Sequence, residues 1–378
     1  MAGDRLSERA YRPAWAEVDL SAIRENAAAL STLAPLCAVV KANAYGHGAA
    51  EVAGAALAGG ATWLAVALVE EGVQLREAGI DAPVLVLAEP TADAMAEAHA
   101  LGLTLTLYSE AGVKAAAGAT GDGEPWPVHV KVDTGMHRVG ASPEEVGAVV
   151  DAVTASGSLV FDGLWTHLAV ADDADQDEFT TLQLARFEEV RSGLAGAGAV
   201  PRIVHAANSA AALAHPDARH DLIRCGIALY GHRPALAIVP PVELRPAMSL
   251  KARVSYVRAL DAGERISYGR RYETPARTVV ATVPLGYADG VTRRLFEVGG
   301  EVLVGGRRCP IAGVVTMDQL MVDCGPDADV NVGDEVVLIG SQGEAEITAW
   351  SVAELLGTIS YEVLCAVGPR VPRVYIGR

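Results

Sequence analysis

The chain has 378 residues, enough for two domains with a large hydrophobic core. Its formal net charge of −17 argues against binding to nucleic acid or to an acidic membrane, although a few local cations and backbone amides can still bind a small anion. Apolar residues make up 51% of the chain, yet no uninterrupted apolar run is long enough to span a membrane, and residues 1–12 are polar and charged. We therefore expect a cytoplasmic protein.

The cysteines are odd in number and widely spaced, and none belongs to a Cys-X-X-Cys pair. This pattern indicates neither a disulfide framework nor a zinc site, so no metal is expected. The cysteines are Cys37, Cys225, Cys309, Cys324 and Cys365.

The first clear strand signal ends at a lysine. The apolar run Leu36–Val40 follows a proline and is typical of a buried strand, and Lys41 comes directly after it. An unpaired ammonium is costly to bury, but a lysine at the end of a strand can form a Schiff base with an aldehyde cofactor. Tyr45 and two glycines follow, which suits a close approach of the backbone to a ligand. On this segment alone, a surface lysine extending from a loop remains the alternative.

The first two thirds of the chain alternate short apolar runs with longer alanine-rich segments of helical character, such as Glu70–Ala78 and Phe179–Ala195. Alternation of this kind predicts a parallel sheet, and eight units in this length favour a closed (β/α)8 barrel of the triosephosphate-isomerase type. An open doubly wound sheet is the alternative, although no Gly-X-Gly-X-X-Gly follows the first run. The eight runs are Leu36–Val40, Trp63–Ala67, Val84–Leu87, Leu103–Leu107, Val128–Val132, Leu164–Thr166, Ile203–Ala206 and Leu222–Ile223.

After Pro241 the helical alternation stops, and valine-rich runs are separated by glycine turns. This pattern predicts a mostly antiparallel β domain, interrupted by one helix at Ser351–Leu356 that Thr348 or Ser351 can cap. We expect the barrel to occupy residues 13–243 and the β domain residues 244–378, with residues 1–12 associated with the β domain. The predicted strand runs are Leu250–Val257, Thr278–Val283, Glu301–Val304 and Glu335–Ile339.

Polar residues gather where the predicted barrel strands end. Chemistry in such barrels takes place at the carboxyl ends of the strands, so these side chains predict one active site. Ser209 opens an alanine-rich helix, where free amides, together with those of Gly226 and Ile227, suit a phosphate; an ordinary helix cap remains the alternative for Ser209. The residues at the strand ends are Lys41, Asp133, Arg138, His167, Asn208, Ser209 and Arg224, and Lys131 lies inside the fifth run.

Taken together, these segments resemble the alanine racemases over nearly the whole chain. The stretch Lys41-Ala42-Asn43-Ala44-Tyr45-Gly46-His47-Gly48 is similar to the family's pyridoxal-phosphate lysine motif. Each further motif is weak alone, but their joint order is specific. They are Lys131-Val132-Asp133-Thr134-Gly135-Met136-His137-Arg138, Ala206-Ala207-Asn208-Ser209, Arg224-Cys225-Gly226-Ile227, Gly286-Tyr287-Ala288-Asp289-Gly290, Met317-Asp318-Gln319 and Tyr361-Glu362-Val363.

The resemblance implies a pyridoxal-5'-phosphate-dependent isomerase that interconverts L- and D-alanine and supplies D-alanine for peptidoglycan. It implies that Lys41 carries the cofactor and acts as one base, and that Tyr287 is the second base on the opposite face of the substrate. A phenol is a poor base unless its charged form is stabilised, and a chain from Tyr287 through His167 to Arg224 does this in the family.

The resemblance also assigns the remaining site residues. Arg138 contacts the cofactor and the substrate carboxylate, and a carbamylated Lys131 orients it. Met317 binds substrate and, with Tyr287, reaches the site from the partner subunit of a homodimer with shared active sites. The cofactor-binding residues are Lys41, Tyr45, Arg138, Asn208, Ser209, Arg224, Gly226, Ile227 and Tyr361.

Arg224 separates the candidate activities. A guanidinium does not give up its proton, so it can only donate to an unprotonated pyridine nitrogen, which weakens the cofactor as an electron sink. That favours a racemase over the first alternative, a barrel-type amino-acid decarboxylase. A racemase of broader specificity, with serine as the obvious competing substrate, is a further alternative. A non-enzymatic carrier of the cofactor would not need the β domain with Tyr287, Met317 and Tyr361.

The chain departs from the family at Val314. The family often has an arginine near the active-site entrance, before the Met-Asp segment, where this chain has Gly313-Val314-Val315-Thr316-Met317. The uncharged Val314 puts the usual polarity of the entrance in doubt.

Overall fold

The computed structural model describes residues 11–121 and 124–378, which form two compact units. The barrel unit contains Ser21–Ala44 and Gly48–Pro246. The β unit contains the described residues up to Leu20, together with Tyr45–His47 and Ala247–Arg378. The expected association of residues 1–12 with the β domain falls, for residues 1–10, outside the described residues.

Eight parallel strands form the nearly closed barrel that the sequence predicts, and each predicted run overlaps one of them. Their order is β8-β7-β6-β5-β4-β3-β2-β9. Between β8 and β9, the Asp221 amide donates to Val204 O and the Arg224 amide to Ala207 O, each at 3.0 Å. The strands are β2 (Leu36–Val39), β3 (Trp63–Val66), β4 (Val84–Val86), β5 (Thr104–Leu107), β6 (Trp126–Lys131), β7 (Leu159–Trp165), β8 (Ile203–His205) and β9 (Ile223–Cys225).

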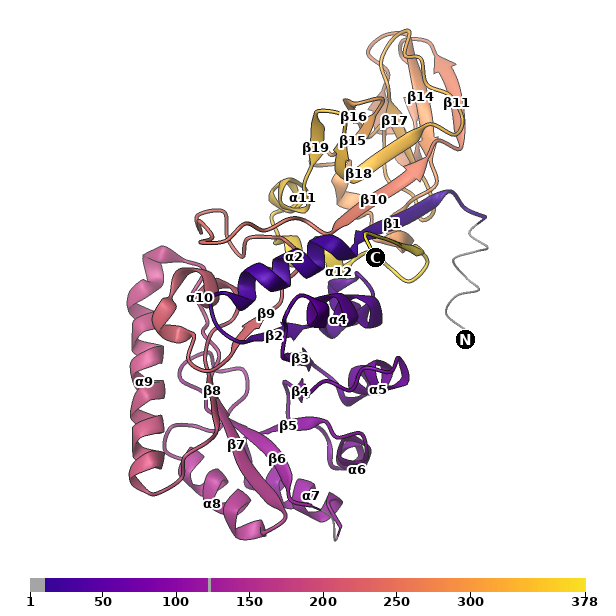
Figure 1. The fold of residues 1–378 in the computed structure, drawn as a ribbon. Coiled ribbons are helices and arrows are strands. Elements are labelled where there is room, and N and C mark those ends of the chain that lie inside the picture. The colour runs from indigo at the N-terminus through magenta and orange to yellow at the C-terminus, as the bar shows by residue number, and fades with distance from the viewer. Residues whose placement is uncertain (1–10, 122–123) are drawn as a thin grey trace. The chain divides into compact units, whose positions relative to one another are not determined.

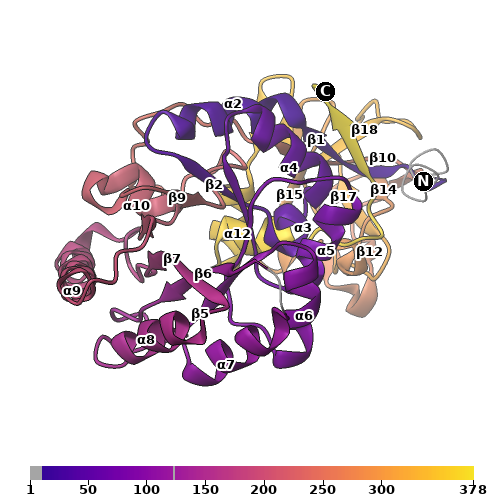
Figure 2. The ribbon, with the colours of Figure 1, turned by 60° about the horizontal axis from the view of Figure 1, so that its bottom comes forward.

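Helices pack outside the ring of strands, as Figure 2 shows for α6 to α9. The strands are therefore buried on both faces, and β2 and β4 are buried at every position, which explains their continuous apolar sequence. Among the described residues, no helix is both long and apolar enough to cross a membrane. The helices are α2 (Leu20–Ser31), α3 (Lys41–Tyr45), α4 (Ala49–Ala58), α5 (Val69–Glu77), α6 (Ala92–Ala100), α7 (Glu110–Ala119), α8 (Val146–Ser156), α9 (Asp177–Gly196) and α10 (Ser209–Ala214).

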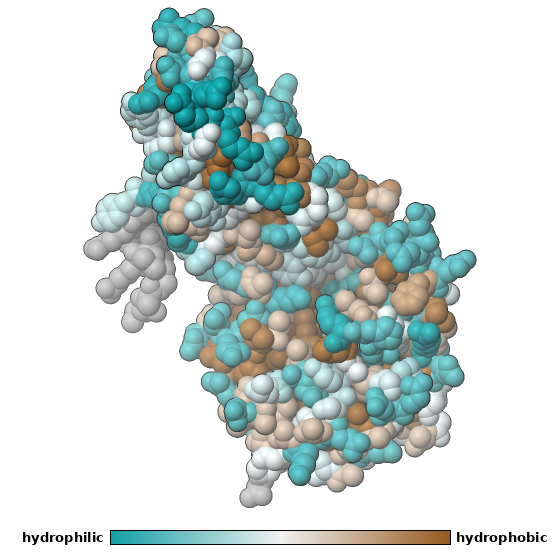
Figure 3. Space-filling view, turned by 180° about the vertical axis from the view of Figure 1, so that it is seen from behind, coloured by the Kyte–Doolittle hydropathy of each residue, from teal (hydrophilic) through white to brown (hydrophobic). Residues whose placement is uncertain are grey.

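The β unit is mostly antiparallel, as predicted, with β1 and β20 as a parallel pair (Figure 1). On the face in Figure 3, hydrophilic residues gather over this unit. Its strands are β1 (Ala14–Asp19), β10 (Met248–Arg253), β11 (Tyr256–Leu260), β12 (Arg265–Ile266), β13 (Tyr272–Glu273), β14 (Thr278–Val283), β15 (Glu301–Val304), β16 (Arg307–Pro310), β17 (Leu320–Asp323), β18 (Glu335–Gln342), β19 (Ala345–Ile347) and β20 (Arg373–Ile376). Its helices are α11 (Ala349–Leu356) and α12 (Ser360–Cys365).

Three details of the β unit differ from the prediction. The run Leu250–Val257 is two strands, because the Val254 amide donates to Asp334 O while the next amide, of Ser255, donates to Thr282 O in a different sheet. A second helix, α12, follows α11. Thr348, rather than Ser351, caps α11, since its side chain accepts the Ser351 amide at 2.9 Å.

Strand β1 belongs to the β unit, although the prediction placed it in the barrel domain. It pairs antiparallel with β10, and its residues alternate between buried and half-buried, as expected for a strand with one face on a core. The boundaries of the two compact units differ from the predicted domain boundaries at residues 13–20, 45–47 and 244–246. The partner strand of β1 lies more than 200 residues later in the chain, so no local pattern could reveal this pairing.

We expect Gly163→Ala to destabilise the barrel. Gly163 of β7 pairs with His129 of β6, and an added Cβ would lie 2.5 Å from the imidazole carbons of His129. Both neighbours are buried, so the cost should be about 1–3 kcal/mol, seen as a lower urea midpoint. The matched control is Gly118→Ala in α7, where an added Cβ has no heavy atom within 4 Å and should stabilise by about 0.4–1 kcal/mol. Equal midpoints for the two variants would contradict this account of the barrel interior.

Candidate active site

Lys41 opens a left-handed turn. Helix α3 contains Ala42, Asn43 and Ala44 at φ values of 52°, 51° and 53° with similar ψ values, which no right-handed helix adopts. Left-handed backbone costs an L-residue roughly 1–2 kcal/mol, so such a run persists only where its surroundings hold it. The Asn43 side chain accepts the Ala49 amide at 2.9 Å, and the Ala44 amide donates to Val40 O at 2.8 Å. Strain of this kind is concentrated at functional sites.

The carboxylate of Glu71 holds the start of this turn. Its Oε1 accepts the Ala42 amide at 2.6 Å, and its Oε2 accepts the amides of Ala67 and Leu68 at 2.7 and 3.1 Å. One side chain of α5 thus joins the carboxyl ends of β2 and β3. Sequence reasoning missed Glu71, although a glutamate at the third position of a helix is a recognisable signal for binding the amides before it.

Arg224 lies at the centre of the barrel unit's polar network and is only 3% exposed. Its Nη1 donates to His205 Nδ1 at 2.9 Å, and its Nη2 donates to the carbonyl oxygens of Thr166 and Ala206 at 2.9 and 3.0 Å. Its Nε and the second N–H of Nη1 make no hydrogen bond to any described residue, so two N–H groups, including that of Nε, remain to donate to a ligand. Burial lowers the pKa of Arg224 to about 10, so the guanidinium stays charged near neutral pH.

The hydrogen bonds around Arg224 determine which ring nitrogen carries the proton in the neighbouring histidines. Since Arg224 Nη1 donates to His205 Nδ1, the His205 proton must sit on Nε2, which lies 3.0 Å from His129 Nδ1. His129 Nε2 then carries a proton and faces Asp162, 3.7 Å away, which Arg202 binds through two hydrogen bonds of 2.8 Å. Burial lowers the pKa of both histidines, so they are neutral. None of His129, Asp162 and His205 was predicted.

His167 also contacts Arg224, whose Nη2 lies 3.4 Å from His167 Nδ1. Burial first, and then the charge of Arg224, hold the pKa of His167 well below its usual value. The neutral ring accepts from Arg224 at Nδ1 and therefore carries its proton on Nε2. His167 is thus a hydrogen-bond donor at the nitrogen that points away from Arg224.

Positive charge accumulates at the ends of these strands. Arg138, Lys131 and Lys41 also act on the His167 ring. Burial, followed by the charges of Arg138 and Arg224, lowers the pKa of Lys131 to about 8. The nearby carboxylate of Asp133 is bound by the amides of Gly135 and His137, at 2.9 and 3.1 Å. A cluster of this sign suits an anionic ligand.

The loops after β8 and β9 meet at Ser209. Its hydroxyl accepts the amide of Gly226 at 3.0 Å, and the amide of Ile227 has no hydrogen-bond partner among the described residues. Asn208, not Ser209, caps α10, by accepting the Ala211 amide at 3.0 Å. Helix α10 has only six residues, so its dipole contributes less than the sequence suggested. The Ile227 amide remains available to an anion.

The other predicted residues lie in the β unit. There the amide of Tyr287 donates to Thr316 O at 3.0 Å, and that of Ala288 donates to Met317 O at 3.1 Å. The predicted segments that contain Tyr287 and Met317 are therefore joined by backbone hydrogen bonds. Gly286 is required at this contact, because a Cβ would lie 2.3 Å from Thr316 O. Tyr287 and Met317 are 43% and 52% exposed.

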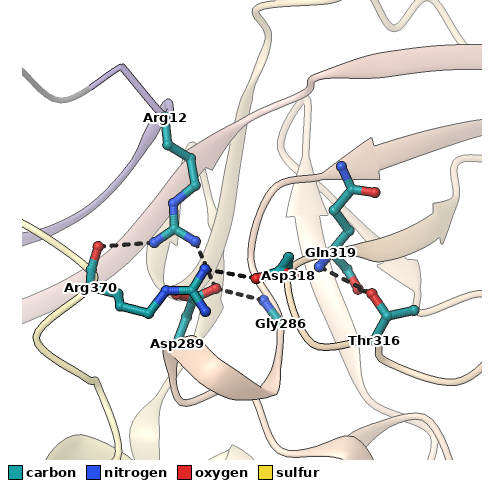
Figure 4. A network of polar contacts seen from close by, with 7 residues as sticks. All are labelled: Arg12, Gly286, Asp289, Thr316, Asp318, Gln319 and Arg370. Carbon is teal, nitrogen blue, oxygen red and sulfur yellow. Dashed lines mark hydrogen bonds and ion pairs between the residues drawn. The ribbon is translucent and has the colours of Figure 1, made fainter.

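The buried carboxylate of Asp289 stabilises the contact between these two segments (Figure 4). Asp289, fully buried, accepts the Gly286 amide at 3.0 Å and binds Arg12 at 2.8 Å. Arg370 lies between Asp289 and Asp318 and binds Asp318 at 2.7 Å. The segment that carries Met317 is thereby tied to the turn that carries Tyr287.

Three further residues of the β unit bear on the prediction. Tyr45 and Tyr361, both predicted to bind the cofactor, have ring centroids 6.1 Å apart. Val314, predicted near the entrance, is only 1% exposed, and its carbonyl accepts the Ser267 hydroxyl at 2.6 Å. Its side chain is thus part of the core of the β unit.

Comparison with known proteins identifies the family. Residues 18–234 match the family model of the alanine racemase N-terminal domain, and residues 247–375 match that of the C-terminal domain. The chain belongs to the alanine racemase family. An alanine racemase of Symbiobacterium thermophilum is 50% identical over 370 residues, covering 97% of this chain and 98% of its relative.

Solved structures of racemases have the same fold as this chain. The alanine racemase of E. faecalis is 41% identical with a TM-score of 0.92, covering 97% of this chain and 99% of that one. A histidine racemase from Leuconostoc mesenteroides is 32% identical with a TM-score of 0.89, covering 97% and 99%. The resemblance to the alanine racemases seen in the sequence is therefore confirmed, and the decarboxylase alternative is not favoured.

We expect Glu71→Gln to loosen the turn at Lys41. The amide of glutamine replaces one acceptor oxygen by a donor, so at least one of the three bound backbone amides loses its partner. The cost should be about 1–3 kcal/mol in stability, with faster hydrogen exchange at Ala42. The control is Glu70→Gln, because Glu70 is exposed and makes no hydrogen bond or ion pair to a described residue. Unchanged exchange at Ala42, Ala67 and Leu68 in the Glu71 variant would rule out this role.

Proposed function

We propose that this chain is an alanine racemase that uses pyridoxal 5'-phosphate to interconvert L- and D-alanine. The observation that carries this proposal is the buried Arg224, which is charged and whose Nε N–H has no partner among the described residues. A pyridine nitrogen is an acceptor that such a donor fits. The positive cluster around His167 supports an anionic cofactor and a substrate carboxylate in the same place.

The residues of the barrel unit fit this cofactor. When bound, pyridoxal phosphate supplies an aldehyde for the substrate amine and a ring that withdraws electrons from the α-carbon. Lys41 would hold the aldehyde, and Arg224 Nε would donate to the ring nitrogen. The Ile227 amide and the Ser209 hydroxyl would bind the phosphate, and the family resemblance adds Tyr45, Asn208, Gly226 and Tyr361.

Arg224 also limits what the site can do. With a pKa of about 10 it keeps its proton near neutral pH, so it would donate a hydrogen bond to the ring nitrogen of the cofactor without protonating it. Its position is fixed by the hydrogen bonds that it donates to His205 and to two carbonyl groups. This arrangement favours removal and return of a single α-proton and disfavours side reactions that need a stronger electron sink.

Two bases on opposite faces of the substrate carry out the proton transfer in this proposal. Lys41 serves one face and Tyr287 the other. His167, neutral with its proton on Nε2, would donate to the oxygen of Tyr287 and favour its basic form. The exposure of Tyr287 and Met317 in a single chain supports a homodimer in which both residues complete the partner's site.

Lys131 is suited to carbamylation. Its pKa of about 8 leaves an appreciable neutral fraction, and the neutral amine is the form that adds carbon dioxide and releases a proton. The product is an anion, which would offset the charge of Arg138 and orient it toward the substrate carboxylate. An unmodified ammonium at this 2% exposed position would instead face two like charges.

Alanine is the proposed substrate, and a racemase of broader specificity is the second candidate. The similarity to a histidine racemase favours testing that candidate, because one fold carries both named activities. The predicted domain limits, 13–243 and 244–378, and a cytoplasmic location remain predictions from the sequence.

The direct test offers each L-amino acid to the purified protein with pyridoxal phosphate. We expect L-alanine to lose its circular dichroism completely without release of carbon dioxide, since a racemase ends at an equal mixture and keeps the carboxylate. L-serine and L-histidine should react at least about tenfold more slowly in kcat/KM. Lys41→Arg keeps the charge but should abolish the reaction. Gas release would support the decarboxylase, and comparable rates would support the broader racemase.

The second test concerns the two bases. In deuterium oxide, Tyr287→Phe should block α-deuterium incorporation into L-alanine while leaving exchange from D-alanine partly intact, because a side chain on one face cannot reach the other. A general base contributes about 10²- to 10⁴-fold, so the loss should be large. Equal loss for both enantiomers would make Tyr287 a positioning residue. A rate on L-alanine within about tenfold of the wild type would remove it from the mechanism.

A further inference from the structure

Two buried cysteines of the β unit lie opposite each other on neighbouring chain segments. Ile311, next to β16, forms an antiparallel bridge with Val322 of β17, and the Ala312 amide donates to Met321 O at 2.7 Å. Continued by two residues, this register places Cys309 directly opposite Cys324. The alternation of bonded and unbonded pairs makes this a non-hydrogen-bonded pair, whose Cα atoms are typically about 4.5 Å apart. That separation lies within the roughly 4.4–6.8 Å range of disulfides.

The two thiols also contact each other. The interaction with the Cys324 thiol, together with the charge of Arg307, lowers the pKa of Cys309 despite its burial. The thiols of Cys309 and Cys324 themselves donate to the carbonyl oxygens of Arg307 and Val322, at 3.7 and 3.9 Å. The same interaction, together with burial, raises the pKa of Cys324. Cys309 is therefore the sulfur with greater thiolate character, and Cys324 is in place to react with it after oxidation.

Both residues border a hollow in the surface of the β unit. Its volume is about 350 Å³, and Arg307 and Tyr272 also line it. Cys309 and Cys324 are only 3% and 4% exposed, so the hollow gives access to a small oxidant rather than to a protein.

The other cysteines differ from this pair. Cys37 and Cys225 are completely buried in the barrel unit, and burial raises the pKa of each to about 12, which makes them unreactive. Cys365 is exposed on α12 and serves as an internal comparison.

We propose that Cys309 and Cys324 are a redox-sensitive thiol pair, and that a hydroperoxide oxidises them to a cross-strand disulfide. The Cys309 thiolate attacks one peroxide oxygen, which breaks the O–O bond, forms a sulfenic acid and releases an alkoxide or hydroxide that takes up a proton. The Cys324 sulfur then displaces the sulfenic oxygen, which leaves as water. Two thiols and one hydroperoxide give one disulfide, one water and one alcohol, or two waters when the oxidant is hydrogen peroxide.

The disulfide would close the base of a specific loop. The chain between the two cysteines contains the turn at Thr316, where its hydroxyl donates to Gln319 O at 2.8 Å, and the exposed Met317 lies in that turn. A cross-link at the base restricts the opening of everything between its ends. An effect on substrate binding through Met317 rests on the proposed function, whereas the disulfide itself does not.

Peptide mapping tests the disulfide on the full-length protein. No lysine or arginine lies between the two cysteines, so trypsin leaves them in one peptide, and a protease that cleaves before aspartate separates them by cutting at Asp318 and Asp323. After treatment with hydrogen peroxide, we expect the two fragments to stay linked in the wild type and in Cys365→Ser, and to separate after reduction. Cys309→Ser and Cys324→Ser should give no link. A link through Cys365, or a Cys309 sulfinic acid beside an intact Cys324 thiol, would overturn the proposal.

Hydrogen exchange tests the effect on the loop. The amides of residues 311–322 should exchange at least about tenfold more slowly in the oxidised wild type than in the reduced protein, because a cross-link over a loop of this length restricts its opening by more than that factor. Oxidised Cys324→Ser should behave like the reduced protein. A disulfide without slower exchange would refute the clamping of the loop. Both measurements are independent of racemase activity, so their failure and that of the proposed function can be told apart.

Discussion

A single buried positive charge organises the barrel unit. Among the described residues, no carboxylate lies within hydrogen-bonding distance of Arg224. Its guanidinium is held instead by two carbonyl oxygens, by His205 and His167, and by the ring of Trp165, 4.6 Å away. Neutral acceptors satisfy its donors without cancelling its charge. An aspartate at this place would have made the barrel easier to assemble, but it would also have neutralised the charge that faces the ligand.

Carboxylates hold the backbone of the site elsewhere in the molecule. Glu71 binds three amides at the ends of β2 and β3, and Glu89 binds the amides of Tyr108 and Ser109 in the same manner further around the barrel. Asp289 does this in the β unit for Gly286. Each acts within the chain rather than on a ligand. The negative groups therefore shape the loops, while the cations are left to bind anions.

Local patterns in the sequence were sufficient for the barrel and for Lys41, because a strand buried on both faces is a continuous apolar run and Lys41 ends one abruptly. The roles given to Arg224 and Tyr287 depended on the family resemblance. His129, Asp162 and Glu71 were not found, since their importance arises from contacts between strands and helices that are distant in sequence. The left-handed turn after Lys41 was also missed, because alanine and asparagine at these positions give no reason to expect it.

The pairing of β1 has a consequence for synthesis of the chain. Strand β1 precedes the barrel, whereas its partners β10 and β20 follow it, so the barrel is an insertion within the β unit. On the ribosome, the whole barrel is synthesised after β1 and before β10. This synthesis takes roughly 10–50 s at the usual rates of elongation, and β1 has no partner strand during that time. During that interval β1 is an unpaired edge with an apolar face, open to misassociation. The barrel can meanwhile fold as soon as its own strands have emerged, so the order of translation favours completion of the insert before the unit that surrounds it.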